Sequence, residues 1–403
     1  MTESPTSENS LRNFTLLMAE TGISTFATSI FTILILWIAI SETKSSLITG
    51  VTSAFLVAPL VLNIVVGAII DKSSRKKVYA IMGPLLKALA AALLLLTIYN
   101  YSLIYETVLL FLSALTFGFS IDILVPIRAI WSQKFLRKPV YLKGMSVANL
   151  VSRGSRLSGF LVAAFAITIN LRITVSTVIL LYIISTVPIL FISSVKDSLL
   201  GKGRLRDVMK DGLSYIGRTN LVAEIVTISS ISALFWGMAD TVSTVMINRV
   251  FNLTSAYLSY TFFAISLGSI AGSSLTSKLE FVKSVGRKLP WLYGSAGLSL
   301  MLIALYPSIL VLLIVFFFVG LVTGIASPII SAVLFGNVPR DKIGRIQGAM
   351  DTFGTSFNSV SGILAGLVMT LIFPGNVFYI MGAGLIALSI IISQFKSLSK
   401  TDI

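Results

Sequence analysis

Residues 67–77 read Gly67-Ala68-Ile69-Ile70-Asp71-Lys72-Ser73-Ser74-Arg75-Lys76-Lys77, a charged loop between two long apolar runs. The runs on either side, 47–70 and 77–99, each have about the 20 residues that a helix needs to cross roughly 30 Å of hydrocarbon. A cluster of lysine and arginine beside such runs is typical of a loop on the cytoplasmic side of a membrane. This stretch therefore predicts two membrane-spanning helices joined by a short cytoplasmic turn.

The same alternation of apolar run and short polar loop continues along the chain. Of the 403 residues, 55% are hydrophobic and 12% charged, and the mean hydropathy is +0.94, which leaves too little polar surface for a soluble domain. We expect an all-α integral membrane fold of twelve transmembrane helices in two pseudo-symmetric six-helix bundles. The predicted spans are 12–40, 47–70, 77–99, 107–131, 144–168, 173–194, 221–247, 256–277, 288–306, 309–335, 344–373 and 375–395.

The loops differ in charge from one side of the membrane to the other. With the N-terminus inside, lysine and arginine concentrate in every cytoplasmic loop, and only Lys44, Arg172 and Arg249 fall in the outer ones. Because cytoplasmic loops carry the excess of basic residues, both termini are predicted to be cytoplasmic, in a multi-pass protein of the plasma membrane. This topology also accounts for the net charge of +15 without a nucleic-acid partner.

The chain is expected to divide into an N-terminal bundle (1–195), a cytoplasmic linker (196–219) and a C-terminal bundle (220–403). Apolar residues at helical spacing within the charged linker predict an amphipathic helix on the inner leaflet.

The two halves repeat at a constant offset of 202 residues. At this offset Pro126 matches Pro328 and Lys143 matches Arg345, and no gap is needed. These matches fall at equivalent places in the two halves, as expected for duplicated six-helix bundles.

Composition excludes several kinds of chemistry. Cysteine and histidine are both absent, so the chain has no thiolate nucleophile, no imidazole base and no ligands of these types for a metal. No nucleophile–base pair, phosphate loop or metal cluster is visible, and we expect neither an enzyme nor a cofactor. Any proton-linked step must use carboxylates.

The loop 67–77 resembles the loop signature of the major facilitator superfamily, in which Gly, three residues, Asp, a basic residue, two more residues and a basic pair follow one another. Ser74 stands where the family usually has a second glycine. The resemblance implies transport by alternating access and a gate at this loop. Gly67 permits close helix approach, and Asp71 can cap a helix or pair with a buried arginine. The matching positions are Gly67, Asp71, Lys72, Arg75 and Lys76.

A softer resemblance covers most of the chain. The opening from Asn13 to Ser24, the run 122–128 and the run 338–345 are similar to the branch that holds macrolide-efflux and enterobactin-exporter proteins. That branch implies proton-driven export of an amphipathic compound. Two departures are Glu20, where the branch usually has glutamine, and Gly154-Ser155, where drug–proton antiporters usually have Gly-Pro. By the family resemblance, Asp122 and Arg128 are expected to join Asp71 and Arg75 in the gate's charge network and not to touch substrate. Arg345 and Asp351, at the start of the eleventh span, are expected in the same inner gate.

Eight charged residues are predicted to lie within the spans. Each costs about 2.5–3.5 kcal/mol at the bilayer centre, so such residues face protein or water and usually pair. Four are acidic and four basic, so complete internal pairing is one open interpretation. They are Glu20, Lys87, Asp122, Arg128, Arg153, Arg156, Asp240 and Asp351.

Arg153 and Arg156 are three residues apart on one helical face, roughly 14–18 Å from the cytoplasmic start of their span at 1.5 Å per residue. Two guanidiniums near the midplane are suited to an anionic substrate, which they would hold by forked hydrogen bonds. The alternative is that they neutralise Asp122, Asp351 or Glu20.

Glu20 and Asp240 are the candidates for protonation-coupled switching, because no histidine is available. A purely structural role for either carboxylate is the alternative. Glycine pairs in several spans are read as packing surfaces, namely Gly268 and Gly272, Gly320 and Gly324, and Gly362 and Gly366.

The predicted function is secondary active transport, with proton-coupled efflux of an amphipathic small molecule by a monomer in the lipid bilayer. Uptake or facilitated transport of a nutrient or organic anion is the nearest alternative, and the arginine pair favours it. A non-transporting membrane receptor or scaffold is an alternative of another class.

Overall fold

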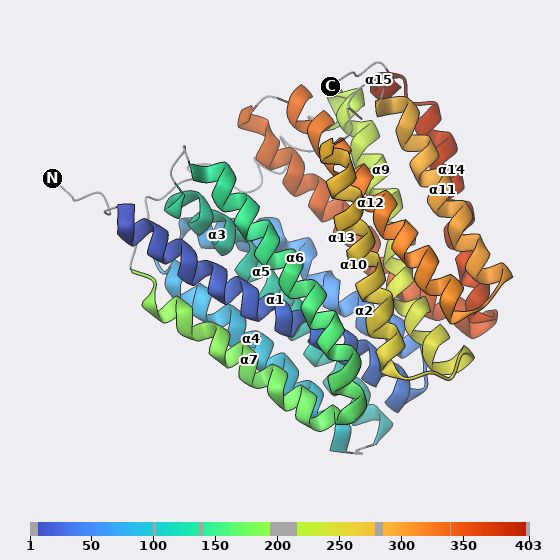
Figure 1. Ribbon diagram of the computed structural model, residues 1–403, viewed down its shortest axis with the longest axis horizontal. Helices are drawn as coiled ribbons and strands as arrows, with labels where there is room; N and C mark the ends of the chain where they lie inside the picture. The colour runs from blue at the N-terminus through green and yellow to red at the C-terminus, as the bar shows by residue number, and fades with distance from the viewer. Residues whose placement is uncertain are drawn as a thin grey trace. The chain divides into compact units, whose positions relative to one another are not determined.

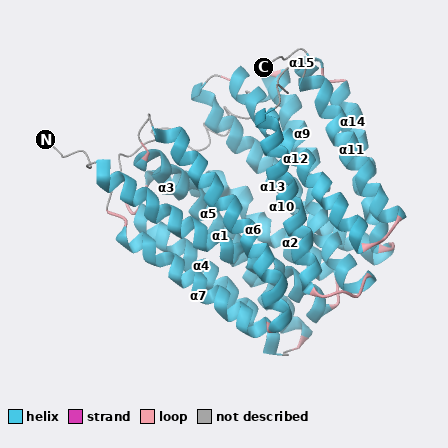
Figure 2. Cartoon of the chain, viewed as in Figure 1, coloured by secondary structure: helices cyan, strands magenta, loops and turns pink. Residues whose placement is uncertain are grey.

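A computed structural model of the chain describes residues 7–99, 102–136, 140–193, 216–278, 285–338 and 340–399. Every element within these ranges is helical (Figure 2). The amphipathic helix predicted for the linker falls largely on 194–215, outside the described residues.

The twelve predicted spans are confirmed as helical segments. Within the described ranges, eleven helices are long and apolar enough to cross a membrane, and a shorter apolar segment, Ser46–Leu62, belongs to the remaining span. The long helices are α1 (Ser7–Thr43), α4 (Lys76–Leu96), α5 (Leu103–Phe135), α6 (Tyr141–Ile169), α7 (Leu171–Phe191), α9 (Asn220–Val245), α10 (Ser255–Lys278), α11 (Val285–Leu305), α12 (Ile309–Asn337), α13 (Arg340–Leu371) and α14 (Val377–Ser393). Short turns are η2 (Thr97–Tyr99), the π-helical η4 (Met246–Val250), η5 (Pro374–Asn376) and α15 (Lys396–Ser399).

The second span is not the single continuous helix that the sequence suggests. Pro59 has no N–H to donate, and its ring clashes with the carbonyl four residues earlier, so the α-helix gives way to a 3₁₀ turn there. The span therefore consists of α2 (Ser46–Val57), η1 (Ala58–Leu62) and α3 (Asn63–Lys72).

The helices form two compact units. Unit 1 comprises Met1–Ile38 and Leu62–Lys202, and unit 2 comprises Ala39–Val61 and Gly203–Ile403. Each has its own apolar core. That of unit 1 includes Leu17, Ile70, Ile127 and Trp131, and that of unit 2 includes Val242, Leu300, Val319 and Phe378. The predicted division into two duplicated six-helix bundles, 1–195 and 220–403 with a linker between them, stays a prediction.

In unit 1, α4 lies alongside α5 and α7 (Figure 1). Helix α6 packs on α1 through small residues. A Cβ on Gly159 would stand 2.6 Å from the carbonyl oxygen of Phe26, and one on Gly22 would stand 3.4 Å from the Ser155 hydroxyl. This close approach of two backbones is the use of glycine expected between membrane helices.

Polar contacts tie the predicted cytoplasmic ends of the unit 1 helices together. The Ser10 hydroxyl donates to the carbonyl of Phe135 at 2.6 Å, which joins α1 to α5. Lys77 Nζ donates to the carbonyls of Leu190 and Ile192 at 2.8 and 2.9 Å, which joins the start of α4 to the end of α7. A cation at a helix C-terminus satisfies carbonyls that the helix leaves free and complements its dipole.

Unit 2 contains the predicted glycine packing surfaces. On α10, a Cβ on Gly268 would stand 2.0 Å from the Phe317 carbonyl oxygen. On α12, a Cβ on Gly320 would stand 2.1 Å from the Ile265 carbonyl oxygen. Gly272 and Gly324 repeat the arrangement one turn along, so these helices meet backbone to backbone, and the packing interpretation is confirmed.

Gly362 and Gly366 of α13 also serve for packing, against α2. A Cβ on Gly50 would lie 2.3 Å from the Gly362 carbonyl oxygen, and one on Gly366 would lie 2.7 Å from that of Ser46. The internal repeat has a structural counterpart as well. Pro126 and Pro328 both lie inside helices, at equal distances from the last residues of α5 and α12.

Candidate functional site

Glu20 of α1 and Arg128 of α5 form a buried ion pair in unit 1. Arg128 Nη2 donates to Glu20 Oε1 at 2.6 Å, and Arg128 Nε donates to Oε2 at 2.9 Å. The Glu20 side chain is 1% exposed and that of Arg128 is 21% exposed. The guanidinium fork matches the carboxylate, and this two-bond geometry is the strong form of an ion pair. The Glu20 carboxylate is thus buried inside unit 1, whereas the Arg128 side chain is partly exposed at its surface.

Lys87 of α4 lies deep in the same unit. Its residue is 3% exposed, and Nζ donates to the hydroxyls of Ser24 and Thr28 at 3.1 Å each. The ammonium also lies 5.7 Å from the ring centroids of Phe117 and Tyr182, within the range of cation–π attraction. Hydroxyls and aromatic faces therefore take the place of a carboxylate partner.

These contacts share one face of α1. Glu20, Ser24 and Thr28 follow one another at intervals of four residues, so their side chains stand in a row along the helix. The Tyr182 hydroxyl extends this row by donating to Thr28 at 3.4 Å. The result is a polar ladder inside unit 1, with the Glu20–Arg128 pair at one end and Lys87 along its side.

The sequence marks Lys87 as an intramembrane charge, but its pattern alone assigns Lys87 no role in the site. The signal that could have identified it is the four-residue spacing of Glu20, Ser24 and Thr28, which predicts a polar row for a partner helix to meet. The pairing of Glu20 with Arg128 was not identified either, since 108 residues separate them.

Asp122 of α5 is fully buried, and neither of its carboxyl oxygens has a hydrogen-bond partner among the described residues. The structure therefore does not bring Asp122 to Arg128. An ionised carboxylate with no partner is costly to bury, and the neutral acid is the form that such an environment accepts. Its expected place in a gate network stays a prediction.

Arg153 and Arg156 of α6 are both exposed, and each guanidinium is within electrostatic reach of the other. Arg156 makes no hydrogen bond or ion pair with any described residue. The structure does not join Arg156 to Glu20, whose carboxylate is occupied by Arg128.

The other two intramembrane carboxylates belong to unit 2. Asp240 is half-buried on α9, and its side chain makes no hydrogen bond or ion pair with a residue in the described part of the chain. Asp351 is exposed on α13 and accepts a hydrogen bond from Gln347 Nε2 at 3.0 Å.

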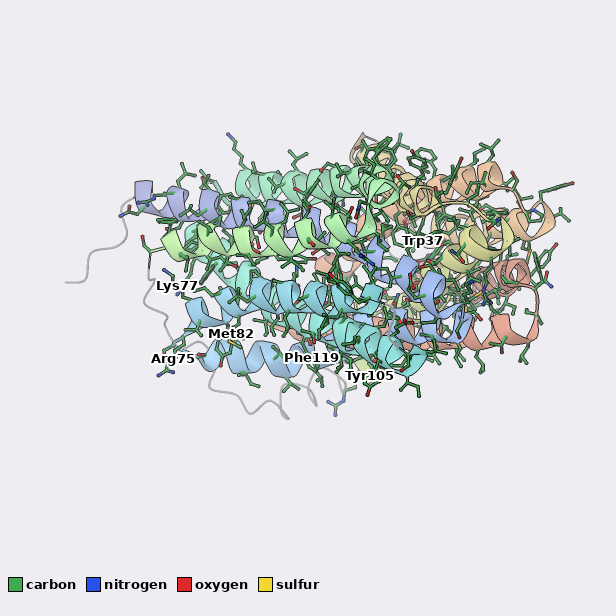
Figure 3. The ribbon with its side chains drawn as sticks, turned by 90° about the horizontal axis from the view of Figure 1, so that it is seen from below. Trp37, Arg75, Lys77, Met82, Tyr105 and Phe119 are labelled. Carbon is green, nitrogen blue, oxygen red and sulfur yellow. The ribbon has the colours of Figure 1, made fainter. Side chains whose placement is uncertain are left out.

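The charged segment 67–77 covers the end of α3, the turn that follows and the start of α4. Arg75 is exposed and directly precedes α4, and Lys76 is buried with its Nζ donating to the Ser73 carbonyl at 3.0 Å. Figure 3 shows Arg75 and Lys77 at the same end of unit 1, with Met82 and Phe119 along its length.

Two expectations for the gate lie outside the described side chains. Asp71 and Lys72 end α3 and Arg345 lies near the start of α13, but only their backbones are described. The structure does not bear out the prediction made for Gly67. No heavy atom lies within 4 Å of a Cβ built there, so the close helix approach expected at Gly67 is not made in the described part of the chain.

Comparison with known proteins gives one family. The model of the Major Facilitator Superfamily matches residues 17–362. A comparison with curated proteins finds no match.

Several solved structures share the fold. The nucleoside transporter NupG superposes with a TM-score of 0.72 at 11% identity, covering 97% of this chain and 100% of that one. A POT family transporter in complex with 5-aminolevulinic acid gives 0.75 at 14% identity, covering 97% of each chain. The human organic anion transporter TETRAN gives 0.65 at 14% identity, covering 97% of this chain and 100% of that one.

Proposed function

This chain belongs to the major facilitator superfamily, and from that premise we propose that it is a proton-coupled secondary transporter of an amphipathic small molecule, working by alternating access. Membership makes the protein a multi-pass membrane transporter of a small molecule and not an enzyme. The coupling ion, the direction and the class of molecule are the parts we propose.

The observation that supports proton coupling most strongly is the Glu20–Arg128 pair. A carboxylate that is 1% exposed depends on its cation, because removing one partner of a buried pair costs about 3–5 kcal/mol. A proton on Glu20 removes the charge that holds Arg128. Since Arg128 is 21% exposed, its guanidinium can then turn toward water. Protonation is thereby linked to a rearrangement between α1 and α5.

Lys87 lies on the same polar ladder. Its Nζ donates to the Ser24 hydroxyl, four residues along α1 from Glu20, so a movement of α1 that follows a change at the Glu20–Arg128 pair also affects the contacts of Lys87. We propose that Glu20 is the proton-binding group and that Arg128 leaves it when the proton binds. We propose Asp240 as the corresponding carboxylate of unit 2. The loop 67–77, Asp122, Arg345 and Asp351 are proposed to form the inner gate.

Export is the direction that the resemblance to the efflux branch favours. The second candidate is uptake of an organic anion, and the exposed pair of Arg153 and Arg156 favours it. TETRAN, a structure of the same fold, is an organic anion transporter by its description. We further propose a monomer in the plasma membrane with both termini in the cytoplasm.

Flux into proteoliposomes tests the proposal. The full chain is reconstituted with a trapped pH-sensitive dye, and fluorescent amphipathic cations, neutral compounds and anions are offered under pH gradients of either sign. We expect at least one compound to accumulate against its own gradient, accompanied by a proton flux that the dye reports. Accumulation that is indifferent to both gradients for every compound would refute proton coupling.

A further inference from the structure

The lipid-facing side of α6 is marked by its exposed apolar residues. Arg156 does not belong to that side, because it continues a different stripe at spacings of four, seven and eleven residues. The members of that stripe, Phe160, Ala163 and Ile167, are buried. The exposed large apolar side chains on the opposite side are Val147, Leu150, Leu161, Val162 and Phe165.

The stripe changes from exposed to buried at the middle of α6. Its outer half, from Phe160 on, is buried, whereas Asn149, Arg153 and Arg156 on its inner half are exposed. Arg153 and Arg156 lie about 18 and 22 Å from the start of α6 at 1.5 Å per residue. A charged side chain at this depth faces protein or water. These guanidiniums are exposed in unit 1 and turned away from the lipid-facing side, so they are available to a polar ligand.

Unit 1 cannot neutralise its own cations. The central parts of its spans hold two carboxylates for four basic side chains. Glu20 is taken by Arg128, and Asp122 has no hydrogen-bond partner among the described residues. Asp240 and Asp351 lie on helices of unit 2. The complete internal pairing that the sequence allowed is therefore not possible within unit 1, and positive charge is left over at Arg156.

We propose that Arg156, supported by Arg153, binds the anionic group of the transported molecule, and that this molecule is an amphipathic carboxylate. The proposal rests on the proposed transport function and names the substrate class for it. Side chains three residues apart project from adjacent places, so two planar guanidiniums can address one carboxylate by forked, charge-assisted hydrogen bonds.

Equilibrium binding to the purified full chain tests this independently of proton coupling. The probes are naphthoate and decanoate, each compared with its neutral amide, which keeps the shape and removes the charge. We expect both carboxylates to bind at least about tenfold more tightly than their amides, as the loss of one charge-assisted hydrogen bond predicts. Equal binding of acid and amide, or no binding of either acid, overturns the proposal.

Matched variants locate the contact. Arg156→Gln is expected to weaken carboxylate binding about tenfold or more and to leave amide binding unchanged. Arg156→Lys, which keeps the charge but not the fork, is expected to fall between Arg156→Gln and wild type. The control is Lys143→Gln, an exposed cation on a different face of α6, which should bind like wild type.

The outcomes separate the two proposals. A carboxylate preference that Arg156→Gln abolishes supports anion recognition even if flux proves indifferent to a pH gradient. A preference that survives Arg156→Gln in a monodisperse protein overturns the role of Arg156, and proton coupling can still hold. If Arg156→Gln does not fold, Arg156→Lys decides, because unchanged affinity in that variant contradicts the forked contact.

Discussion

At the scale of single residues, Glu20→Gln tests the proposed coupling group. The amide keeps the size of the side chain but removes the charge that Arg128 binds through two hydrogen bonds. We expect transport in proteoliposomes to lose its dependence on the pH gradient, because the amide cannot take up a proton in this range, while exchange of substrate for substrate continues.

Glu224→Gln is the matched control for this variant. Glu224 of α9 is also a glutamate on a membrane helix, but its carboxylate accepts hydrogen bonds from the backbone N–H groups of Ser397 and Leu398, at 3.2 and 2.8 Å. Flux through this variant should still follow the pH gradient. Retention of gradient dependence by Glu20→Gln would exclude Glu20 as the proton site.

Asp122→Asn is expected to leave the stability of the fold unchanged and to affect transport. The carboxyl group is fully buried without a hydrogen-bond partner in the described part of the chain, so its charge supports no contact there. An amide of the same shape should leave the free energy of unfolding within about 1 kcal/mol of wild type or raise it, whereas transport should fall, because the proposed inner gate uses the charge in another conformation. Thermal unfolding in detergent and flux measure both. A folded variant without transport would show that the charge is used in another conformation.

The sequence identifies the charged residues of the site, but it does not identify their partners. Glu20, Arg128 and Arg156 could be chosen from the sequence, because any charge in an apolar span is costly. Their partners could not, because a contact between residues 108 positions apart depends on how helices rotate and pack. Lys87 shows the same limit, since its hydroxyl and aromatic partners carry no charge to mark them.

At the scale of elements, the α10–α12 contact predicts a strong effect of one methyl group. A Cβ on Gly268 would stand 2.0 Å from the carbonyl oxygen of Phe317, which is backbone and cannot turn aside. Gly268→Ala should therefore destabilise the protein by about 1–3 kcal/mol, as overpacking of a close contact does. A lower midpoint of thermal unfolding in detergent measures it.

Gly354→Ala on α13 is the control for this effect. No heavy atom lies within 4 Å of a Cβ built there, and alanine favours the helix over glycine by about 0.8–1.0 kcal/mol. Its midpoint should equal or exceed that of wild type. Equal losses in the two variants would mean that the cost comes from glycine replacement in general and not from the contact.

The positions of the membrane spans could be predicted from the sequence, but the places where a span departs from a continuous α-helix could not. Each of the twelve spans follows from its length and hydropathy, which depend on the bilayer and not on neighbouring helices. The break at η1 has a visible cause in Pro59, but Pro84, Pro126 and Pro328 stand inside unbroken helices. Neighbouring helices can re-satisfy the freed backbone groups, so a proline alone does not decide between a break and a continuous helix.

At the scale of the whole molecule, the predicted topology can be tested directly because the chain has no native cysteine. Single cysteines at Ser74 and Asn337 should be protected from a membrane-impermeant maleimide in intact cells. Single cysteines at Ser102 and Thr254 should react. All four positions are exposed, so accessibility depends on the side of the membrane. Labelling of Ser74→Cys and Asn337→Cys on opposite sides would contradict the arrangement of the spans.

For the second candidate function, uptake of an organic anion, the charge of the carried molecule predicts the direction of proton coupling. Gly22 of α1 packs against Ser155 of α6, so Glu20 and Arg156 flank one helix–helix contact. An anion held at Arg156 brings negative charge toward this contact and a proton bound there offsets that charge, so by reciprocity the two ligands favour each other's binding. The anion and the proton should therefore move in the same direction. We expect naphthoate to accumulate in vesicles with an acidic exterior and an alkaline lumen, and Arg156→Gln to abolish this accumulation. Accumulation driven instead by an acidic lumen would mean exchange, and would return the proposal to export.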